Sequence, residues 1–190
     1  AMEHSLTGME FASGIPGSVG GGVRMNAGAY GGEMSRIVEC VEVMYKDGSI
    51  LELDNETMEF GYRKSVLKTR PYVILQVTLK LMEGDRETIA ASMKELAAQR
   101  RARQPLEYAS AGSTFKRPEG YYAGKLIMDA GLRGARIGGA QVADKHCGFL
   151  INDGTATAAD IAELIQEVIE KVKERFGVEL EPEVIFLGDF

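Results

Sequence analysis

The chain has 190 residues, a hydrophobic fraction of 45% and a charged fraction of 26%, which are ordinary values for a globular protein of one large or two small domains. Its formal net charge of −6 argues against a general nucleic-acid surface, because phosphate binding requires a basic field. No apolar run could span a bilayer, and no secretory signal is visible. Cys40 and Cys147 stand alone, without the spacing of a disulfide framework or zinc site. We therefore expect a reduced, cytoplasmic protein.

Glycine is concentrated near the start of the chain. Nine of the 23 glycines lie between Gly8 and Gly32, most of them in "GIPGSVGGGVRMNAGAYGG". Such a backbone needs either positive φ at several positions or very close approach by another group. Pro16 suits the first turn of a short helix that Ser13 could cap, and such a helix start can hold an anion or a cofactor. Spacing alone slightly favours the alternative, tight packing against another element.

The predicted elements of the first half begin with residues 1–7 as the end of a helix. Val41, Val43 and Tyr45 then alternate with other residues in a strand pattern, and the Asp-Gly pair in "KDGS" predicts a hairpin turn. A third strand, "YVILQVTLKLM", is expected to direct one alternating set of apolar side chains to one face: Val73, Leu75, Val77, Leu79 and Leu81. From Gly84 the pattern becomes helical and ends before Pro105.

The second half predicts an α/β arrangement. We expect a helix at 121–130 and short strands near 136–143 and 147–152. The clearest helix is "TAADIAELIQEVIEKVKERFG", with Thr157 as N-cap and Gly177 as C-cap. Its apolar stripe consists of Ile161, Leu164, Ile165, Val168, Ile169, Val172 and Phe176. "VELEPEVIFLG" is expected to form a closing strand.

Two motifs combine cations with small or hydroxyl residues. "SAGSTFKRP" places Ser113 beside Lys116 and Arg117, which suits an anionic substrate, although a polar turn with solvated cations is the alternative. No local histidine could activate Ser113 as a nucleophile, so proton donation is the more plausible role. In "GYRKS", Arg63 considered alone is more simply a surface arginine.

Two further motifs lie near the end of the chain. "DKHCGFLIN" contains His146, but His4 is the only other histidine, which argues against a metal site. A turn with local hydrogen bonds is the more common outcome there, and Cys147 is interpreted as a packed small residue. In "LEPEVIF", Glu181 and Glu183 would face the same side of a strand, either toward a cleft or into solvent.

In their order, these motifs closely resemble the UDP-N-acetylenolpyruvoylglucosamine reductase family. The residues that carry the resemblance are "GIPGSVGG", "MNAGAYG", "YRKS", "SAGSTFKRP", "AGKLIMDAGLRGARIGGAQVADKHCGFLIN" and "LEPEV". The chain is similar to the shorter subtype, because no tyrosine-bearing insertion divides the 121–140 region. The resemblance implies reduction of UDP-N-acetylglucosamine enolpyruvate to UDP-N-acetylmuramate, with FAD as cofactor and NADPH as reductant.

The resemblance also implies roles for individual residues. Ser113 would donate the proton, while Arg63 and Glu183 would flank and polarise the substrate carboxylate. Substrate contacts would come from Tyr62, Arg117, Arg133 and His146. The flavin would lie along a bare backbone, since the resemblance assigns cofactor binding to Gly14, Ile15, Pro16, Gly17, Ser18, Gly20, Gly21, Asn26, Ala27, Gly28 and Ala29. No metal is implied, and the expected partner is a small UDP-sugar, with no nucleic acid, no membrane and a monomeric state.

The expected fold class is α+β, with two domains. Residues 1–84 would form an incomplete PCMH-type FAD-binding domain, and residues 85–190 an α/β substrate-binding domain of the reductase C-terminal type, in which 179–190 is a returning strand with Glu183. In the family an N-terminal lobe with its own phosphate turn precedes this region, whereas Gly14 is only thirteen residues from the start here. We therefore expect a fragment that is inactive alone. The alternative function is a nucleotide-sugar binding module without redox activity.

Overall fold

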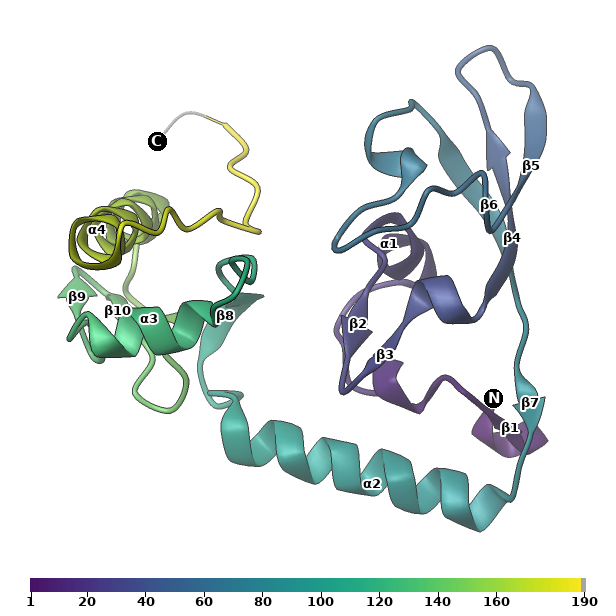
Figure 1. Cartoon of the computed structure of the whole chain (residues 1–190), viewed down its shortest axis with the longest axis horizontal. Coiled ribbons are helices and arrows are strands. Elements are labelled where there is room, and N and C mark those ends of the chain that lie inside the picture. Colours follow the sequence, from purple (N-terminus) through teal and green to yellow (C-terminus); the bar gives the residue numbers. More distant parts are fainter. Residues whose placement is uncertain (189–190) are drawn as a thin grey trace. The chain divides into compact units, whose positions relative to one another are not determined.

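The structure, a computed structural model, describes residues 1–188 and consists of two compact units, Ala1–Gln99 and Arg100–Phe190 (Figure 1). Each unit has its own hydrophobic core. The unit boundary lies within the long helix α2 (Arg86–Arg103), which confirms the helix predicted between Gly84 and Pro105. The predicted domain boundary at residue 84 lies just before this helix and stays a prediction. None of the described helices is long and apolar enough to cross a membrane.

Unit 1 is built around a three-stranded antiparallel sheet in the order β5-β4-β6, with bounds β4 (Val38–Met44), β5 (Ile50–Asp54) and β6 (Val73–Leu79). The Asp-Gly hairpin is confirmed, because β4 and β5 pair across a turn in which Gly48 has a φ of 85°. Val41 and Val43 of β4 are fully buried. They anchor the core of unit 1.

The predicted orientation of β6 is wrong in its first half. Val73 and Leu75 are 55% and 46% exposed, whereas Ile74 packs against the core. The cause is a register shift against β4: Glu42 pairs with Gln76, but Val43 pairs with Ile74. An extra residue in one strand of a pair reverses the side-chain alternation. Val77 and Leu79 therefore pack inward as predicted, while the residues before the shift do not.

Short elements surround this sheet. The helix predicted to end in residues 1–7 is wrong: a single 3₁₀ turn stops at Ser5, whose φ of 55° is left-handed, and a strand follows. Helix α1 begins after Ser18, whose side chain accepts a hydrogen bond from the Gly21 N–H, so Ser18 and not Ser13 is the cap. The bounds are η1 (Met2–His4), β1 (Leu6–Thr7), η2 (Glu10–Ala12), α1 (Val19–Arg24), β2 (Gly28–Ala29), β3 (Gly32–Glu33), η3 (Met34–Arg36), η4 (Val66–Lys68) and β7 (Met82–Glu83). Strand β1 pairs with β7, and β2 with β3.

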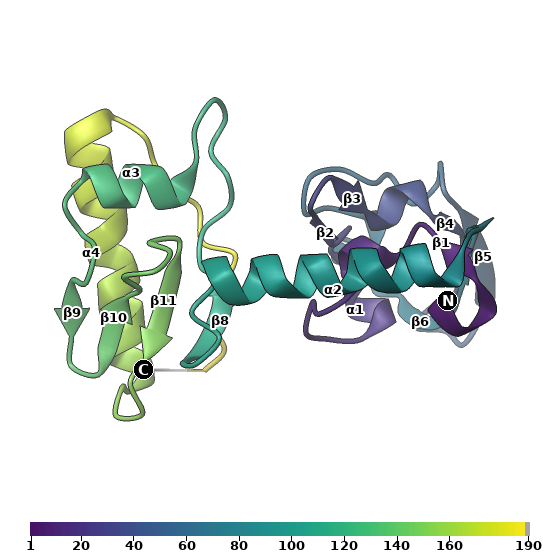
Figure 2. The same cartoon turned by 90° about the horizontal axis from the view of Figure 1, so that it is seen from below.

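Unit 2 is a four-stranded antiparallel sheet with two helices (Figure 2). The sheet has the order β8-β11-β10-β9, and α4 packs on one of its faces. The bounds are β8 (Ala109–Ser113), α3 (Ala123–Asp129), β9 (Arg136–Ile137), β10 (Ala140–Val142), β11 (Phe149–Asn152) and α4 (Ala158–Phe176). These elements confirm the two helices and the short strands predicted for this half.

Helix α4 is confirmed in detail. Thr157 and Asp160 form a reciprocal capping box, and Gly177 ends the helix at a φ of 68°. The stripe faces the core at Leu164, Ile165, Val168 and Val172, which are buried. Phe176, the last residue of the predicted stripe, is 37% exposed.

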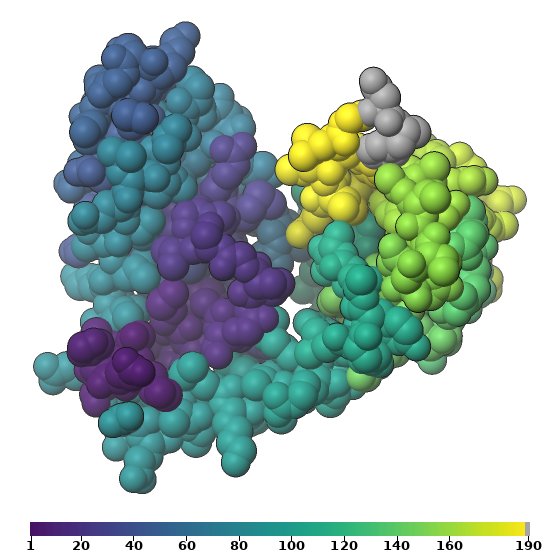
Figure 3. Space-filling view, turned by 180° about the vertical axis from the view of Figure 1, so that it is seen from behind, coloured from purple at the N-terminus to yellow at the C-terminus, as the bar shows by residue number. Residues whose placement is uncertain are grey.

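The predicted closing strand is not a regular strand. Over the described residues 178–188, one isolated bridge joins Pro182 to Phe115. A proline has no N–H, so it cannot continue a ladder of hydrogen bonds. Beyond the bridge the segment lies on the surface of unit 2 (Figure 3, yellow), where Ile185 and Leu187 are 75% and 82% exposed. Residues 189 and 190 of the predicted strand lie outside the described residues.

Candidate active site

Two of the bare positions near the start of the chain are explained by packing inside unit 1. A Cβ on Gly32 would lie 2.5 Å from the Phe11 ring, and one on Gly28 would lie 2.8 Å from the Gly32 carbonyl oxygen. Both positions belong to the β2–β3 pair. The packing interpretation of the glycine-rich stretch therefore holds for this pair.

The glycines of α1 have no such internal reason. The atoms nearest to a Cβ would be at 3.6 Å for Gly20, 3.4 Å for Gly21 and 3.8 Å for Gly22, which are ordinary contacts. Glycine is less favourable than alanine in a helix by about 1 kcal/mol. Three successive glycines thus weaken a helix that has room for side chains. This pattern fits a surface that a group outside the unit approaches closely.

Asn26 was predicted to bind the cofactor, but its side chain is committed within unit 1. It is 2% exposed, accepts a hydrogen bond from the Ser35 N–H at 2.8 Å and donates one to the Gly61 carbonyl at 3.0 Å. Its backbone has a left-handed φ of 44°, which asparagine tolerates better than most residues. Asn26 therefore joins the glycine-rich segment to the turn that carries Tyr62 and Arg63.

Tyr62 and Arg63 occupy a tight two-residue turn. Gly61 and Lys64 exchange backbone hydrogen bonds of 3.0 and 3.1 Å across it, and Arg63 has a φ of 52°. The guanidinium lies 5.2 Å from the Tyr62 ring centroid, and its Nη2 donates to the Gly28 carbonyl at 3.3 Å. A predicted catalytic residue and a predicted cofactor-binding residue are thus in direct contact.

Ser65, which ends the "YRKS" motif, supports the turn of Tyr62 and Arg63 and was not predicted from the sequence. It is fully buried, and its hydroxyl donates to the Arg24 carbonyl at 2.6 Å. Arg24 in turn donates to the Leu67 carbonyl at 2.7 Å. These bonds fix the segment after Arg63 to the end of α1. A small hydroxyl residue at the end of the "YRKS" motif was the available signal.

In unit 2, the structure brings the segments of Ser113 and Glu183 together. Ser113 ends β8, and the next residue, Thr114, accepts a hydrogen bond at its carbonyl from the Glu183 N–H at 2.8 Å. The Lys116 N–H donates to the Glu181 carbonyl at the same distance, and the side chains of Lys116 and Glu181 form an ion pair. Leu180, 2% exposed, anchors the start of this segment in the core.

His146 accepts a hydrogen bond at Nδ1 from the Gly148 N–H at 3.0 Å, so Nδ1 carries no proton in this arrangement. Partial burial of the ring lowers the pKa of His146 below its ordinary value. A neutral imidazole bound in this way presents Nε2–H as a donor. The turn with local hydrogen bonds is confirmed, and it leaves this nitrogen suited to an acceptor on a ligand.

Two predicted substrate contacts are arginines with aromatic or sulfur neighbours. The Arg117 guanidinium lies 4.0 Å from the Tyr122 ring centroid, and its Nε donates to the Tyr121 carbonyl. Arg133 lies beside Met128 and Cys147. Burial raises the pKa of the Cys147 thiol despite the nearby Arg133 charge, which agrees with a packed and not a reactive cysteine.

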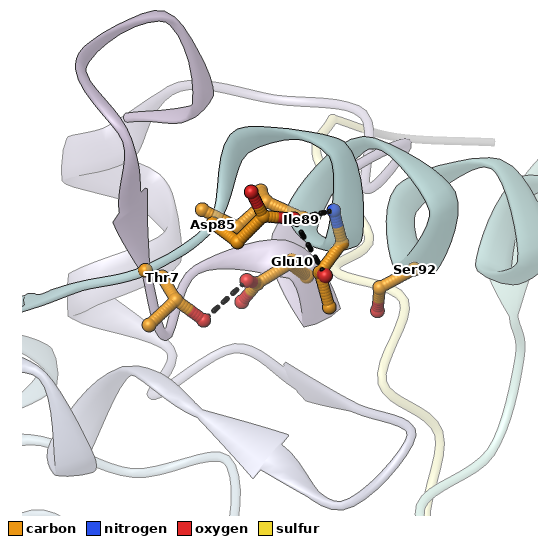
Figure 4. Close-up of a pocket in the computed structure, with 7 residues that line it drawn as sticks. Thr7, Glu10, Asp85, Ile89 and Ser92 are labelled. Carbon is orange, nitrogen blue, oxygen red and sulfur yellow. Dashed lines mark hydrogen bonds between the residues drawn. The ribbon is translucent and has the colours of Figure 1, made fainter.

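A cavity of about 410 Å³ in unit 1 lies away from all of these residues (Figure 4). It is lined by Thr7, Glu10, Gly84, Asp85, Thr88, Ile89 and Ser92. Burial opposes ionisation of Glu10, but hydrogen bonds from Thr7 and the Gly8 N–H outweigh it and lower its pKa. Among residues 1–188, no cluster of His, Cys, Asp and Glu side chains could hold a metal ion.

Comparison with known proteins gives each unit a counterpart. Residues 104–187 match the family model described as UDP-N-acetylenolpyruvoylglucosamine reductase, C-terminal domain, and residues 1–54 match the FAD binding domain family model. A crystal structure of UDP-N-acetylenolpyruvylglucosamine reductase from Thermus caldophilus is similar with a TM-score of 0.84 at 42% identity, over 96% of this chain and 66% of that chain. The α+β fold class, with a FAD-binding part followed by a part of the reductase C-terminal type, is therefore confirmed.

Curated proteins named UDP-N-acetylenolpyruvoylglucosamine reductase are similar over nearly the whole chain. The Lachnoclostridium phytofermentans protein is 57% identical over 185 residues, which are 97% of this chain and 60% of that relative. The Clostridioides difficile protein is 54% identical over 187 residues, 98% of this chain and 62% of the relative. The chain thus spans about three fifths of the length of the curated relatives it matches.

Proposed function

We propose that this chain, as a member of the UDP-N-acetylenolpyruvoylglucosamine reductase family, carries catalytic residues for the reduction of UDP-N-acetylglucosamine enolpyruvate to UDP-N-acetylmuramate. The reaction would use NADPH and FAD, and it would be a step of peptidoglycan precursor synthesis. The observation that carries the proposal is the pairing of the Glu183 segment with the strand end that bears Ser113. Backbone hydrogen bonds hold the segments of Ser113, the proposed proton donor, and Glu183 side by side.

The residues present fit a bound flavin. Gly20 and Gly21 of α1 have no side chain, so a flavin could approach the backbone closely at these positions. Contacts within unit 1 do not require glycine at either of them. The predicted contacts at Gly14, Ile15, Pro16, Gly17, Ser18, Ala27, Gly28 and Ala29 belong to the same segment, whereas Asn26 acts there through the backbone it holds. FAD, when bound, would supply hydride transfer between NADPH and the substrate.

Side chains of this chain would then stabilise the negative charge that develops on the substrate and donate the proton. Reduction at the enolpyruvyl methylene develops negative charge toward the carboxylate, which the Arg63 guanidinium would stabilise. The Ser113 hydroxyl would donate the proton that completes the reduction, and Glu183 would help to hold the substrate carboxyl end. Arg117, Arg133 and the Nε2–H of His146 would bind the nucleotide diphosphate, and Tyr62 would contact the substrate beside Arg63. The monomeric state, the cytoplasmic location and the absence of nucleic-acid or membrane partners stay predictions.

The test separates the two half-reactions. It uses a completed chain, defined as these 190 residues joined to the part of the L. phytofermentans relative that they do not span. Ser113→Ala in the completed chain is expected to spare flavin reduction by NADPH and to slow product formation by about 100-fold or more, because a positioned proton donor contributes roughly that much. Stopped-flow absorbance of the flavin and chromatography of the product measure the two rates.

The control is Ser92→Ala on α2, a partly exposed serine for whose hydroxyl no hydrogen bond occurs among the described residues; it should leave both rates unchanged. Equal loss of both half-reactions in Ser113→Ala would count against the proton-donor role. We expect the 190-residue chain alone to show no turnover, and an absorbance spectrum of that chain shows directly whether flavin is bound.

A nucleotide-sugar binding module is the second candidate, because Ser113, Arg117, Arg133, His146 and Glu183 all belong to unit 2. Calorimetric titration of the 190-residue chain with UDP-N-acetylglucosamine derivatives tests it. Absence of detectable heat at millimolar ligand would rule this candidate out.

A further inference from the structure

We propose that Thr114 is a positioning residue that holds Ser113 and Glu183 in a common register through its buried hydroxyl. The proposal rests on the proposed function for the roles of Ser113 and Glu183. In the sequence, Thr114 stands out only as part of the "SAGSTFKRP" motif. The structure places it at a junction of three segments, where it is 3% exposed.

Thr114, the residue that follows β8, makes three hydrogen bonds to other parts of unit 2. Its N–H donates to the Gly148 carbonyl at 2.8 Å, and its hydroxyl accepts from the Leu150 N–H at 3.1 Å. Its carbonyl accepts from the Glu183 N–H at 2.8 Å. One residue therefore connects the turn after His146, strand β11 and the C-terminal segment.

The hydroxyl has a specific reason to be there. The pairing of β8 with β11 shifts register, since Phe149 pairs with Ser113 but Ile151 pairs with Ser110. Between these two pairs the register gives Leu150 no β8 residue opposite it, and the Leu150 N–H donates to the Thr114 hydroxyl. Gly112, with a φ of 87°, provides the irregular backbone just before Ser113. Such bulges re-aim side chains and often lie beside active sites.

The hydroxyl can be separated from the shape of the side chain. Valine has nearly the volume of threonine but cannot accept from Leu150, so Thr114→Val leaves a buried N–H without its partner. Thr114→Ser keeps the acceptor and loses a methyl group. If Thr114 only fills space in the core, the valine variant should be the more active of the two. If its hydroxyl positions Ser113 and Glu183, the serine variant should be the more active.

The kinetic arm uses the completed chain. Thr114→Val is expected to slow product formation by about 10- to 100-fold, since small displacements of catalytic groups have effects of that size. The KM for the enolpyruvyl nucleotide and the rate of flavin reduction should change by less than about threefold, because neither depends on proton delivery. Thr114→Ser should recover product formation to within about threefold of the unsubstituted rate.

The control is Thr78→Val in unit 1, a partly exposed threonine on β6 for which no hydrogen bond of the hydroxyl occurs among the described residues; it should leave all rates unchanged. The proposal is overturned if Thr114→Val matches the unsubstituted protein, if both half-reactions fall equally, or if serine is no better than valine.

A second arm needs no activity. In the 190-residue chain, Thr114→Val should speed amide hydrogen exchange at Leu150 and Glu183 by about tenfold or more while Val168 and Val172 in α4 keep their protection. If amide exchange in α4 accelerates equally, the substitution has caused a general loss of stability. If exchange at Glu183 does not accelerate, the hydroxyl has no effect on that segment. Either outcome overturns the proposal. If the unsubstituted completed chain does not turn over, the proposed function fails, while this exchange arm still decides the role of Thr114.

Discussion

At the scale of single residues, the bare backbone near the start of the chain divides into two kinds of glycine. Gly28 and Gly32 are required by contacts of unit 1 with itself, because a Cβ at either position would collide with a neighbour. Gly21 is exposed and has room for a side chain. The first kind serves folding, and the second is explained by the proposed flavin surface.

Alanine substitutions should separate the two kinds. Gly21→Ala is expected to leave the free energy of unfolding unchanged or to raise it by up to about 1 kcal/mol, because alanine favours the helix. In the completed chain it should lower FAD retention. Gly28→Ala should lower the free energy of unfolding by roughly 1–3 kcal/mol through overpacking. Urea unfolding and flavin absorbance after gel filtration measure the two effects; normal FAD retention in Gly21→Ala would argue against the cofactor surface.

Sequence reasoning proposed residues for the chemistry but not the residues that support them. Arg63, Ser113 and Glu183 came from a motif order that a single sequence displays. Thr114 and Ser65 were missed because their importance depends on hydrogen bonds to Leu150 and Arg24, which lie 36 and 41 residues away along the chain. A long-range hydrogen bond has no local pattern from which it could be predicted.

At the scale of elements, helices and strands were predicted most accurately where one hydrophobic periodicity continues without interruption. Helix α4 has both caps and a continuous stripe, and it was predicted nearly to its ends. Strand β6 and the segment after Glu179 were predicted less well, because a register shift and Pro182 interrupt their pairing. The register shift depends on a partner strand, which the local sequence does not show, whereas Pro182 is visible in the sequence and argues against a regular strand there.

The capping box of α4 gives a prediction for this scale. Thr157→Ala removes the acceptor for the Asp160 N–H, so we expect the free energy of unfolding of unit 2 to fall by about 1 kcal/mol. Thr157→Ser should retain most of this stabilisation. Glu163 is exposed on the same helix, and Glu163→Ala should leave the free energy of unfolding nearly unchanged. Chemical unfolding followed by circular dichroism measures the differences. An unchanged midpoint in Thr157→Ala would show that the box contributes nothing.

At the scale of the whole molecule, the two hydrophobic cores share no residue. The core of unit 2 is drawn from residues between Phe115 and Val184, and that of unit 1 from residues between Met9 and Leu81. A fragment of residues 100–190 should therefore fold by itself, with a cooperative urea transition at the midpoint that unit 2 shows in the whole chain. A fragment without dispersed amide resonances would mean that unit 2 needs the rest of the chain.

The register shift in β6 has a consequence for how this chain behaves in concentrated solution. It turns Val73 and Leu75 outward on one edge strand, while Ile50 and Leu51, 59% and 42% exposed, lie on the other. Edge strands that combine unpaired backbone groups with apolar side chains are templates for intermolecular pairing and aggregation. The irregularity that lets Ile74 reach the core therefore exposes apolar side chains on β6, in addition to those that β5 already exposes. A charged substitution on either edge strand would improve solubility without disturbing the interior.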